Sequence, residues 1–356
     1  MTLGSRSGVL AVLLSAAIQK RLLDRKFAIP IIALCILLIV IKWQSFIGRL
    51  FIWKICLENT GQYWFSGTGS NTFNYWYSNW QHDYFLAHPG WTHFHKLADC
   101  PSHPYNEFLN IFVEYGIIGL AVLLAAFVLP AIKWRQSVRD WQLAVHAGLM
   151  TFFVFSMVYD PFTSFLARFV FAVHIGVLLV PRQQVLRLCW LILFVVLGYT
   201  TVSKEMARSK ANTDWETGEL LSITDPAQAE VFFNKAEPVL FRNRFFAESH
   251  SRNLLSLDTN QALRYLYLNI HLNQYQSHMM IAGVYQLKNI RPVAVKHFTE
   301  AHYIIPNRFI PMYHLYLLAK DAKDSSQAEY WRKKVRNTPV KIPSKQIEYI
   351  KLQMGL

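Results

Sequence analysis

Long apolar runs alternate with short polar segments through residues 1–202 of the chain. A helix needs about 20 mostly apolar residues to cross a bilayer. The runs therefore predict about six membrane spans, of which the first is the shortest and weakest. They cover residues 7–19, 27–42, 107–132, 143–158, 163–180 and 188–202.

The charges of the connecting segments predict how these spans are oriented. Residues 19–26 carry four basic side chains, residues 133–140 carry three, and residues 181–187 carry two. Cytoplasmic loops of membrane proteins carry an excess of Lys and Arg, so we place these three segments inside. Residues 43–106, which we call the external loop, and all residues after 202 are then expected outside the membrane.

The remainder of the chain has a helical and repetitive pattern. One stretch matches the spacing of a tetratricopeptide repeat (TPR), in which small residues let two helices approach closely. Its residues are Tyr285, Ala294, Phe298, Ala301 and Pro306. Weaker copies are the sets Ala229, Phe233 and Ala236, then Ala262 and Leu266, then Leu315 and Ala328. The alternative to such repeats is an ordinary helical bundle.

The predicted fold is therefore all-α, with two domains. Residues 1–202 are expected to form a polytopic membrane domain, with the external loop between its second and third spans. Residues 203–356 are expected to form a soluble TPR-like helical domain. This predicts a multi-pass membrane protein, with the external loop and the second domain on the outer side of the membrane.

Composition supports this division and excludes some partners. Of the 36 Lys and Arg residues, 21 lie in residues 203–356, together with 14 of the 22 Asp and Glu residues. The net charge of +14 is shared evenly between the two parts, and neither has a dense basic run, so we expect no nucleic-acid partner. Cys56 and Cys100 lie in the external loop, where an oxidising compartment would let them pair.

The external loop holds most of the candidate chemistry. A structureless loop of this length is uncommon and is usually functional or a small domain. Arg49, Trp53 and Cys56 are spaced to share one face of a short amphipathic helix. Further along, Gly67 and Gly69 allow a tight turn and a close approach of two backbones.

The loop closes on a polar cluster at the mouth of the third span. The cluster contains His103, Asn106 and Glu107, and the span that follows contains Glu114. An acid at the first turn of a helix is favoured by the helix dipole, so a capping role is expected for Glu107. An acid inside a span is costly, so Glu114 is expected to pair with Arg168 or with a backbone donor.

The order of these motifs resembles the O-antigen ligase and O-antigen polymerase superfamily. The resemblance covers about residues 4–180 and includes a Ser-Arg stretch at Arg6. The matching positions in the loop and the third span are Arg49, Trp53, Gly67, Phe73, His103, Asn106, Leu109, Glu114, Gly116 and Gly119. The adjacent His-Asn pair usual in the family is replaced here by His-Pro-Tyr-Asn.

The resemblance implies glycosyl transfer at the periplasmic face of the membrane. It implies a glycan donor linked to undecaprenyl diphosphate, and an acceptor that is lipid A–core, a growing glycan or a protein. Arg6 and Arg49 would hold the donor diphosphate, and His103 would activate the acceptor hydroxyl. Trp53, Gly67, Gly69, Asn106 and Glu107 would bind substrate, with no metal or other cofactor.

Chemistry is compatible with these roles. The guanidinium of Arg stays protonated and presents planar paired donors to a leaving diphosphate. The imidazole of His titrates near neutral pH and suits a general base. The histidines at 82, 88, 93 and 95 lack a carboxylate or cysteine set that would complete a metal site. Asp160, in the hairpin after the fourth span, is a candidate for supporting the site.

The small number of predicted spans leaves other interpretations of the chain open. Members of the superfamily usually have more spans, so this chain is expected to be the C-terminal part of such an enzyme or to work with a separate chain. The alternative is a non-catalytic membrane-anchored scaffold, whose repeats recruit a periplasmic protein. A transporter is a weaker alternative, because the chain has a long external loop and no inverted repeats.

Overall fold

The computed structural model describes four stretches of the chain, and all elements in them are helices, in agreement with the all-α class. The described residues are 43–90, 93–134, 140–179 and 183–356. The two spans expected at 7–19 and 27–42 lie outside them. The chain divides into two compact units. Unit 1 comprises residues 1–73 and 102–205, and unit 2 comprises residues 74–101 and 206–356.

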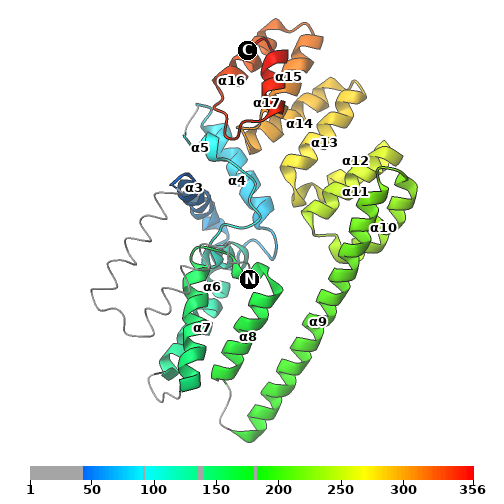
Figure 1. Ribbon diagram of the computed structural model, residues 1–356. Helices are drawn as coiled ribbons and strands as arrows, with labels where there is room; N and C mark the ends of the chain where they lie inside the picture. The colour runs from blue at the N-terminus through cyan, green and yellow to red at the C-terminus, as the bar shows by residue number, and fades with distance from the viewer. Residues whose placement is uncertain (1–42, 91–92, 135–139, 180–182) are drawn as a thin grey trace. The chain divides into compact units, whose positions relative to one another are not determined.

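Three apolar helices that pack on one another form the main body of unit 1 (Figure 1). They are α6 (Glu107–Trp134), α7 (Asp140–Ser156) and α8 (Phe165–Leu179). Leu123, Phe127 and Leu149 form their buried centre, and further phenylalanine rings pack around it. The other elements of unit 1 are α3 (Trp43–Asn59), η1 (Thr60–Gln62), η2 (Pro161–Thr163) and the first part of α9 (Gln184–Leu221).

Among the described residues, α6 is the one helix long and apolar enough to cross a membrane. Its residues Glu107–Pro130 have a mean hydropathy of 2.4 over their most apolar window, of which only 28% is buried in the protein. An apolar surface that the protein leaves uncovered suits lipid better than water. Phe165–Leu178 in α8 is a shorter apolar helix. Membrane crossing by α7, α8 and the start of α9 stays a prediction.

Unit 2 is a series of helices in which each of α10 to α15 packs against the next one along the chain. The series is α10 (Pro226–Leu240), α11 (Arg244–Leu257), α12 (Thr259–Asn269), η3 (Ile270–Leu272), α13 (Gln274–Leu287), α14 (Arg291–Ile304), α15 (Phe309–Asp321), α16 (Ser325–Asn337) and α17 (Lys345–Gln353). Short polar residues begin many of these helices. For example, the side chain of Asp225 accepts a hydrogen bond from the Gln228 N–H, and Asp324 caps α16 in the same way.

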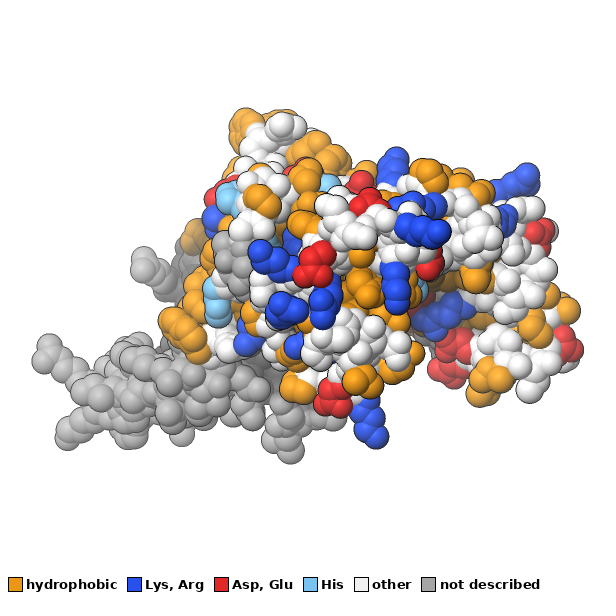
Figure 2. Space-filling view, turned by 90° about the horizontal axis from the view of Figure 1, so that it is seen from above, with side chains coloured by type: hydrophobic (Ala, Val, Ile, Leu, Met, Phe, Trp, Pro, Cys, Tyr) orange, Lys and Arg blue, Asp and Glu red, His pale blue; other side chains and the backbone are white. Residues whose placement is uncertain are grey.

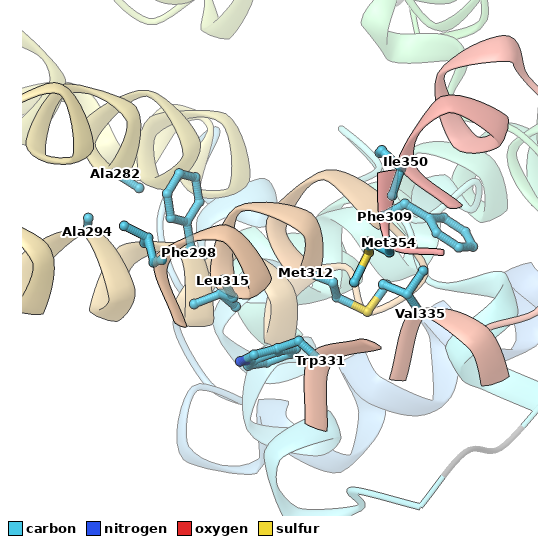
Figure 3. Packing of buried hydrophobic residues seen from close by; sticks show 11 residues of the cluster. Ala282, Ala294, Phe298, Phe309, Met312, Leu315, Trp331, Val335, Ile350 and Met354 are labelled. Carbon is cyan, nitrogen blue, oxygen red and sulfur yellow. The ribbon is translucent and has the colours of Figure 1, made fainter. Parts of the chain in front are cut away.

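The core of unit 2 shows why small residues recur along this part of the chain. Ala282 and Ala294 are fully buried where α13 and α14 meet, with Phe298 and Leu315 beside them (Figure 3). Their small side chains let the two helix backbones approach closely. The alanines expected at repeat positions 229, 236, 262 and 301 are also fully buried. The assignment of these helix pairs as TPR units stays a prediction.

The charged surface of the protein is mixed. Figure 2 shows Lys and Arg side chains on the visible face, with acidic and uncharged side chains between them. That face has no continuous basic stripe of the kind that tracks a phosphate backbone.

Residues 74–101 pack with the C-terminal helices rather than with unit 1. They contain most of α4 (Phe73–Ala87) and all of α5 (His93–Leu97). The sequence placed them within the external loop of the membrane domain. The loop therefore contributes to both units: residues 43–73 and 102–106 belong to unit 1, and the middle belongs to unit 2.

We expect unit 2 to lose stability when the pH falls from about 7.5 to about 5. Burial lowers the pKa of His302 to about 3, and the charge of Lys334 acts in the same direction. In the unfolded chain the pKa is about 6.5, so only the unfolded state takes up the proton at pH 5. The stability is therefore fully present above pH 6.5 and is lost as the pH falls, by about 2 kcal/mol at pH 5.

Peptide-resolved hydrogen exchange of α14 at the two pH values, corrected for intrinsic exchange rates, measures this loss. His302→Gln should reduce the pH dependence by about 2 kcal/mol, because the new side chain does not titrate, while the other buried histidines of unit 2 keep their share. His271→Gln is the matched control, since His271 is exposed. Equal protection of α14 at both pH values in the unmodified protein would contradict the prediction.

Candidate functional site

Helix α3 carries two of the expected site residues on the face predicted from their spacing. The Arg49 Nη1 donates to the Val158 carbonyl oxygen over 2.7 Å, and its guanidinium lies 5.0 Å from the centre of the Tyr105 ring. One turn further, the Trp53 Nε1 donates to the Pro104 carbonyl oxygen over 2.8 Å. This face of α3 therefore holds the segment that contains His103.

The segment Ser102–Asn106 forms a constrained turn just before α6. Tyr105 has a positive φ of 57°, a backbone conformation that is costly for a bulky residue and needs support from its surroundings. Arg49 and Trp53 supply that support on one side. At the end of the turn, the Asn106 side chain accepts from the Leu109 N–H over 3.0 Å and caps α6. His103 is half-buried within this turn.

Asp160 fixes the same turn from the hairpin between α7 and α8. Its Oδ1 accepts from the Asn106 N–H over 3.0 Å, and the residue is 4% exposed. Burial raises the pKa of Asp160 to about 6, while its backbone hydrogen bonds and the charge of Arg49 oppose the rise. Arg49 and Asp160 thus form a pair of opposite charges that both contact the turn, at Tyr105 and at the Asn106 N–H.

Glu107 connects the start of α6 to the hairpin. It is 2% exposed, and its Oε2 accepts from the Phe162 N–H over 3.2 Å. The sequence favoured a place for this acid at the start of the helix, and Glu107 lies in the first turn of α6, where the helix dipole favours an acid. The side chain that caps α6 by a hydrogen bond is that of Asn106.

Gly67 and Gly69 of the external loop lie against a break in α6. Gly116 has φ 64° and ψ −161°, which interrupts the helix. The Val113 and Glu114 carbonyl oxygens accept from the N–H groups of Thr68 (2.8 Å) and Gly69 (2.9 Å). The Ile117 N–H donates in return to the Trp64 carbonyl oxygen over 2.8 Å. The loop thereby replaces hydrogen bonds that the break removes from the helix.

This exchange needs glycine on both partners. A Cβ atom on Gly67 would lie 2.3 Å from the Glu114 backbone, and one on Gly116 would lie 2.2 Å from the Phe65 carbonyl oxygen. The expected close approach of backbones at Gly67 is thus confirmed, and the backbone it approaches is that of α6. A substrate-binding role for Gly67 and Gly69 stays a prediction.

Glu114 lies inside α6 and faces the turn that follows these glycines. Its Oε1 accepts from the Phe73 N–H over 3.3 Å. Arg168, the alternative partner, lies 3.4 Å from Glu205 instead. Of the two options that the sequence left open for Glu114, the backbone donor is therefore the one observed.

The structure thus brings together the expected residues Arg49, Trp53, His103, Asn106 and Glu107 in unit 1, and Arg6 lies outside the described residues. Sequence reasoning missed the support that Tyr105 receives and the hydrogen-bond exchange at Gly116. The only sequence signal for the exchange was the pairing of a G-x-G turn with a glycine inside an apolar helix. Cys56 and Cys100 are both free thiols.

The described residues contain no group of three or more His, Cys, Asp or Glu side chains placed to hold a metal ion. His82, one of the histidines considered for such a site, lies 3.0 Å from Glu300 in unit 2. His95 is buried in the same unit, and burial lowers its pKa to about 4.

The family model described as O-Antigen ligase matches residues 1–124 of the chain. No curated protein matches the chain. The matched residues include α3, the G-x-G turn, the His103 turn and the break in α6. The match indicates a membrane protein of polysaccharide biosynthesis and glycosyl transfer of the O-antigen ligase or polymerase type.

Proposed function

We propose that the chain transfers a glycan from undecaprenyl diphosphate to an acceptor hydroxyl at the periplasmic face of the bacterial inner membrane. The acceptor is lipid A–core, a growing glycan or a protein. The observation that carries this proposal is that Arg49 and Asp160 both contact the turn that contains His103, at Tyr105 and at Asn106. Transfer from a diphosphate needs a cation that stabilises the leaving group and a general base that activates the acceptor. Arg49 and His103 can supply these groups, and the buried acid Asp160 fixes the turn.

In the proposed reaction, the acceptor oxygen attacks the anomeric carbon of the donor sugar. The bond between that carbon and the diphosphate oxygen breaks, and undecaprenyl diphosphate leaves with the bonding electrons. His103 takes the proton of the acceptor hydroxyl. Arg49 stabilises the charge on the leaving diphosphate, since Val158 occupies one of the five N–H donors of its guanidinium. Arg6 would act on the same diphosphate.

Asp160 and Trp53 are positioning residues in this scheme. Asp160 holds the Asn106 backbone, and Trp53 holds that of Pro104, so the backbone on the C-terminal side of His103 is bound at two points. A fixed backbone limits the positions open to the imidazole, and restricted geometry of this kind accounts for much of enzymatic rate acceleration. No metal is needed for the step as written.

The proposed topology follows from the apolar helices and the basic loops. Helices α6, α7, α8 and the first part of α9 cross the bilayer, and residues 133–140 and 181–187 lie in the cytoplasm. The turn at His103 then lies at the outer surface of the membrane. A polyprenyl donor in the bilayer presents its diphosphate at this depth, where it can meet a water-soluble acceptor.

Arg49→Lys is expected to lower the rate of transfer about 100-fold, the effect typical of removing a charge-stabilising donor. Lys keeps the positive charge, but its single nitrogen cannot present the planar paired donors with which Arg binds a diphosphate. The measurement is release of undecaprenyl diphosphate from an undecaprenyl-diphosphate-linked glycan by the full chain in proteoliposomes. Lipid A–core, free glycan and an unfolded protein are supplied in parallel as acceptors.

The matched control is Arg168→Lys, because Arg168 belongs to the same unit and pairs with Glu205 at its surface. It should retain nearly full activity, since exposed ion pairs contribute little. A wild-type chain that releases no undecaprenyl diphosphate with any acceptor would contradict the proposal. That result would favour the non-catalytic scaffold.

A further inference from the structure

The middle of the external loop is bound by the C-terminal helices. The side chain of Gln81, in α4, is fully buried, and its Nε2 donates to the Ile304 carbonyl oxygen at the end of α14 over 2.6 Å. The Tyr77 hydroxyl donates to the Gln81 Oε1 over 2.7 Å and fixes the amide in this orientation. The Gln274 Nε2 in α13 donates to Asn79 on the same helix α4 over 3.0 Å.

Asn307 recognises the end of α5. It is 6% exposed, and its Nδ2 lies 3.0 Å from the His95 carbonyl oxygen, 3.1 Å from that of Lys96 and 2.8 Å from that of Ala98. Carbonyl groups at the end of a helix have no partner within the helix. The side-chain amide group of Asn307, between α14 and α15, supplies the hydrogen-bond donor for the three carbonyl groups at the end of α5.

Charged side chains of unit 2 surround the residues that follow α5. Arg308 and Lys341 lie 3.6 Å and 3.4 Å from the Asp99 carboxylate. The Arg244 Nη1 donates to the Cys100 carbonyl oxygen over 3.1 Å. Arg244, Arg308 and Lys341 are far apart in the sequence. They meet around Asp99 and the Cys100 carbonyl group only because unit 2 is folded.

We propose that unit 2 is a receptor for the chain's own residues 74–100, and that it acts as a positioning module for glycosyl transfer. It binds a helix end followed by an acid, and the chain itself supplies that ligand. His103 follows the bound segment by three residues, so a bound Cys100 limits where the turn can begin. The positioning role rests on the proposed function, whereas the binding of residues 74–100 does not.

Cys100 offers a built-in reporter of this binding. Cys100 is half-buried, and its Sγ lies 3.8 Å from the Ser78 Oγ. Burial raises the pKa of the thiol to about 12, which slows its reaction with maleimide. Cys56, buried in α3 of unit 1, reports unfolding of the other unit. Peptide-resolved mass spectrometry distinguishes the two labelling sites in one sample.

Asn307→Asp is the first test, made in the full chain purified in detergent. The substitution replaces the amide donor with a carboxylate that faces three carbonyl oxygens. Labelling of Cys100 through opening of the segment should become about ten- to a hundredfold faster, and Cys56 should stay protected. Asn337→Asp is the matched control, because Asn337 is exposed at the end of α16.

Asp99→Lys is the second test. It decides the question if Asn307→Asp also exposes Cys56 and therefore unfolds the chain more widely. Asp99 is exposed, so its replacement leaves the core intact while it repels Arg308 and Lys341. Cys100 should be labelled faster, and Asp321→Lys should have no effect. Rapid labelling of Cys100 in the unmodified protein, or unchanged protection in both variants, would overturn the binding.

Transfer activity separates binding from positioning. In both variants the rate of undecaprenyl diphosphate release should fall in step with the exposure of Cys100. Exposure without a fall in rate would refute the positioning role and leave the binding in place. An inactive wild-type chain with a protected Cys100 would refute the proposed function alone.

Discussion

His103→Ala should abolish glycan transfer and leave the fold of unit 1 unchanged. A general base in the proposed position contributes about 10²- to 10⁴-fold to the rate. Its loss should therefore reduce the release of undecaprenyl diphosphate by at least about 100-fold. The fold should survive because other residues hold the turn: the Trp53 Nε1 binds the Pro104 carbonyl oxygen, and Asp160 binds the Asn106 N–H.

The matched control for this variant is His93→Ala. His93 is an exposed histidine of the external loop at the start of α5, and its replacement should leave the rate unchanged. Thermal unfolding in detergent checks that His103→Ala is folded. A folded His103→Ala chain with more than about one tenth of the normal rate would exclude His103 as the general base.

Gly116→Ala should destabilise unit 1 by about 3 kcal/mol or more. The φ of 64° with ψ −161° is a backbone conformation open essentially to glycine alone, and a Cβ would meet the Phe65 carbonyl oxygen at 2.2 Å. Because the obstructing atom belongs to the backbone, no side-chain rotation relieves the overlap. Gly67→Ala should have a similar effect, since its Cβ would meet the Glu114 backbone.

Limited proteolysis within residues 64–73 measures this effect, together with the temperature of unfolding in detergent. Gly48→Ala is the matched control, because a Cβ there meets nothing within 4 Å and Gly48 lies inside helix α3. Alanine at that position should be neutral or stabilising by up to about 1 kcal/mol. Equal protease resistance of the Gly116→Ala and Gly48→Ala chains would show that the break in α6 tolerates a side chain.

Local patterns predicted the helical elements well. Apolar runs marked α6, α7, α8 and the first part of α9, because most of each run lies in one helix. The break of α6 at Gly116 was not marked by its run. The spacing of Arg49 and Trp53 predicted one face of α3 for the same reason. Side chains three or four residues apart share a helix face whatever the rest of the chain does.

The contacts between distant segments were not predictable in this way. Asn307 and Asp160 bind backbone groups far away in the sequence. Every residue type has a backbone carbonyl group, and all but proline have an N–H group, so the identity of the partner residue does not reveal the contact. The same holds for residues 74–101, which the sequence placed in the external loop of the membrane domain. In the structure several of these side chains are buried against the C-terminal helices instead.

The break in α6 has a consequence for the biogenesis of the protein. With α6 as a span, its open backbone groups at Val113, Glu114 and Ile117 must find partners, because lipid offers none. Residues 64–69 supply them, and they leave the ribosome before α6 does. The segment that completes the helix is thus already synthesised when the helix enters the membrane. In the proposed topology, translocation of residues 43–73 and insertion of α6 are therefore expected to be coupled steps rather than independent ones.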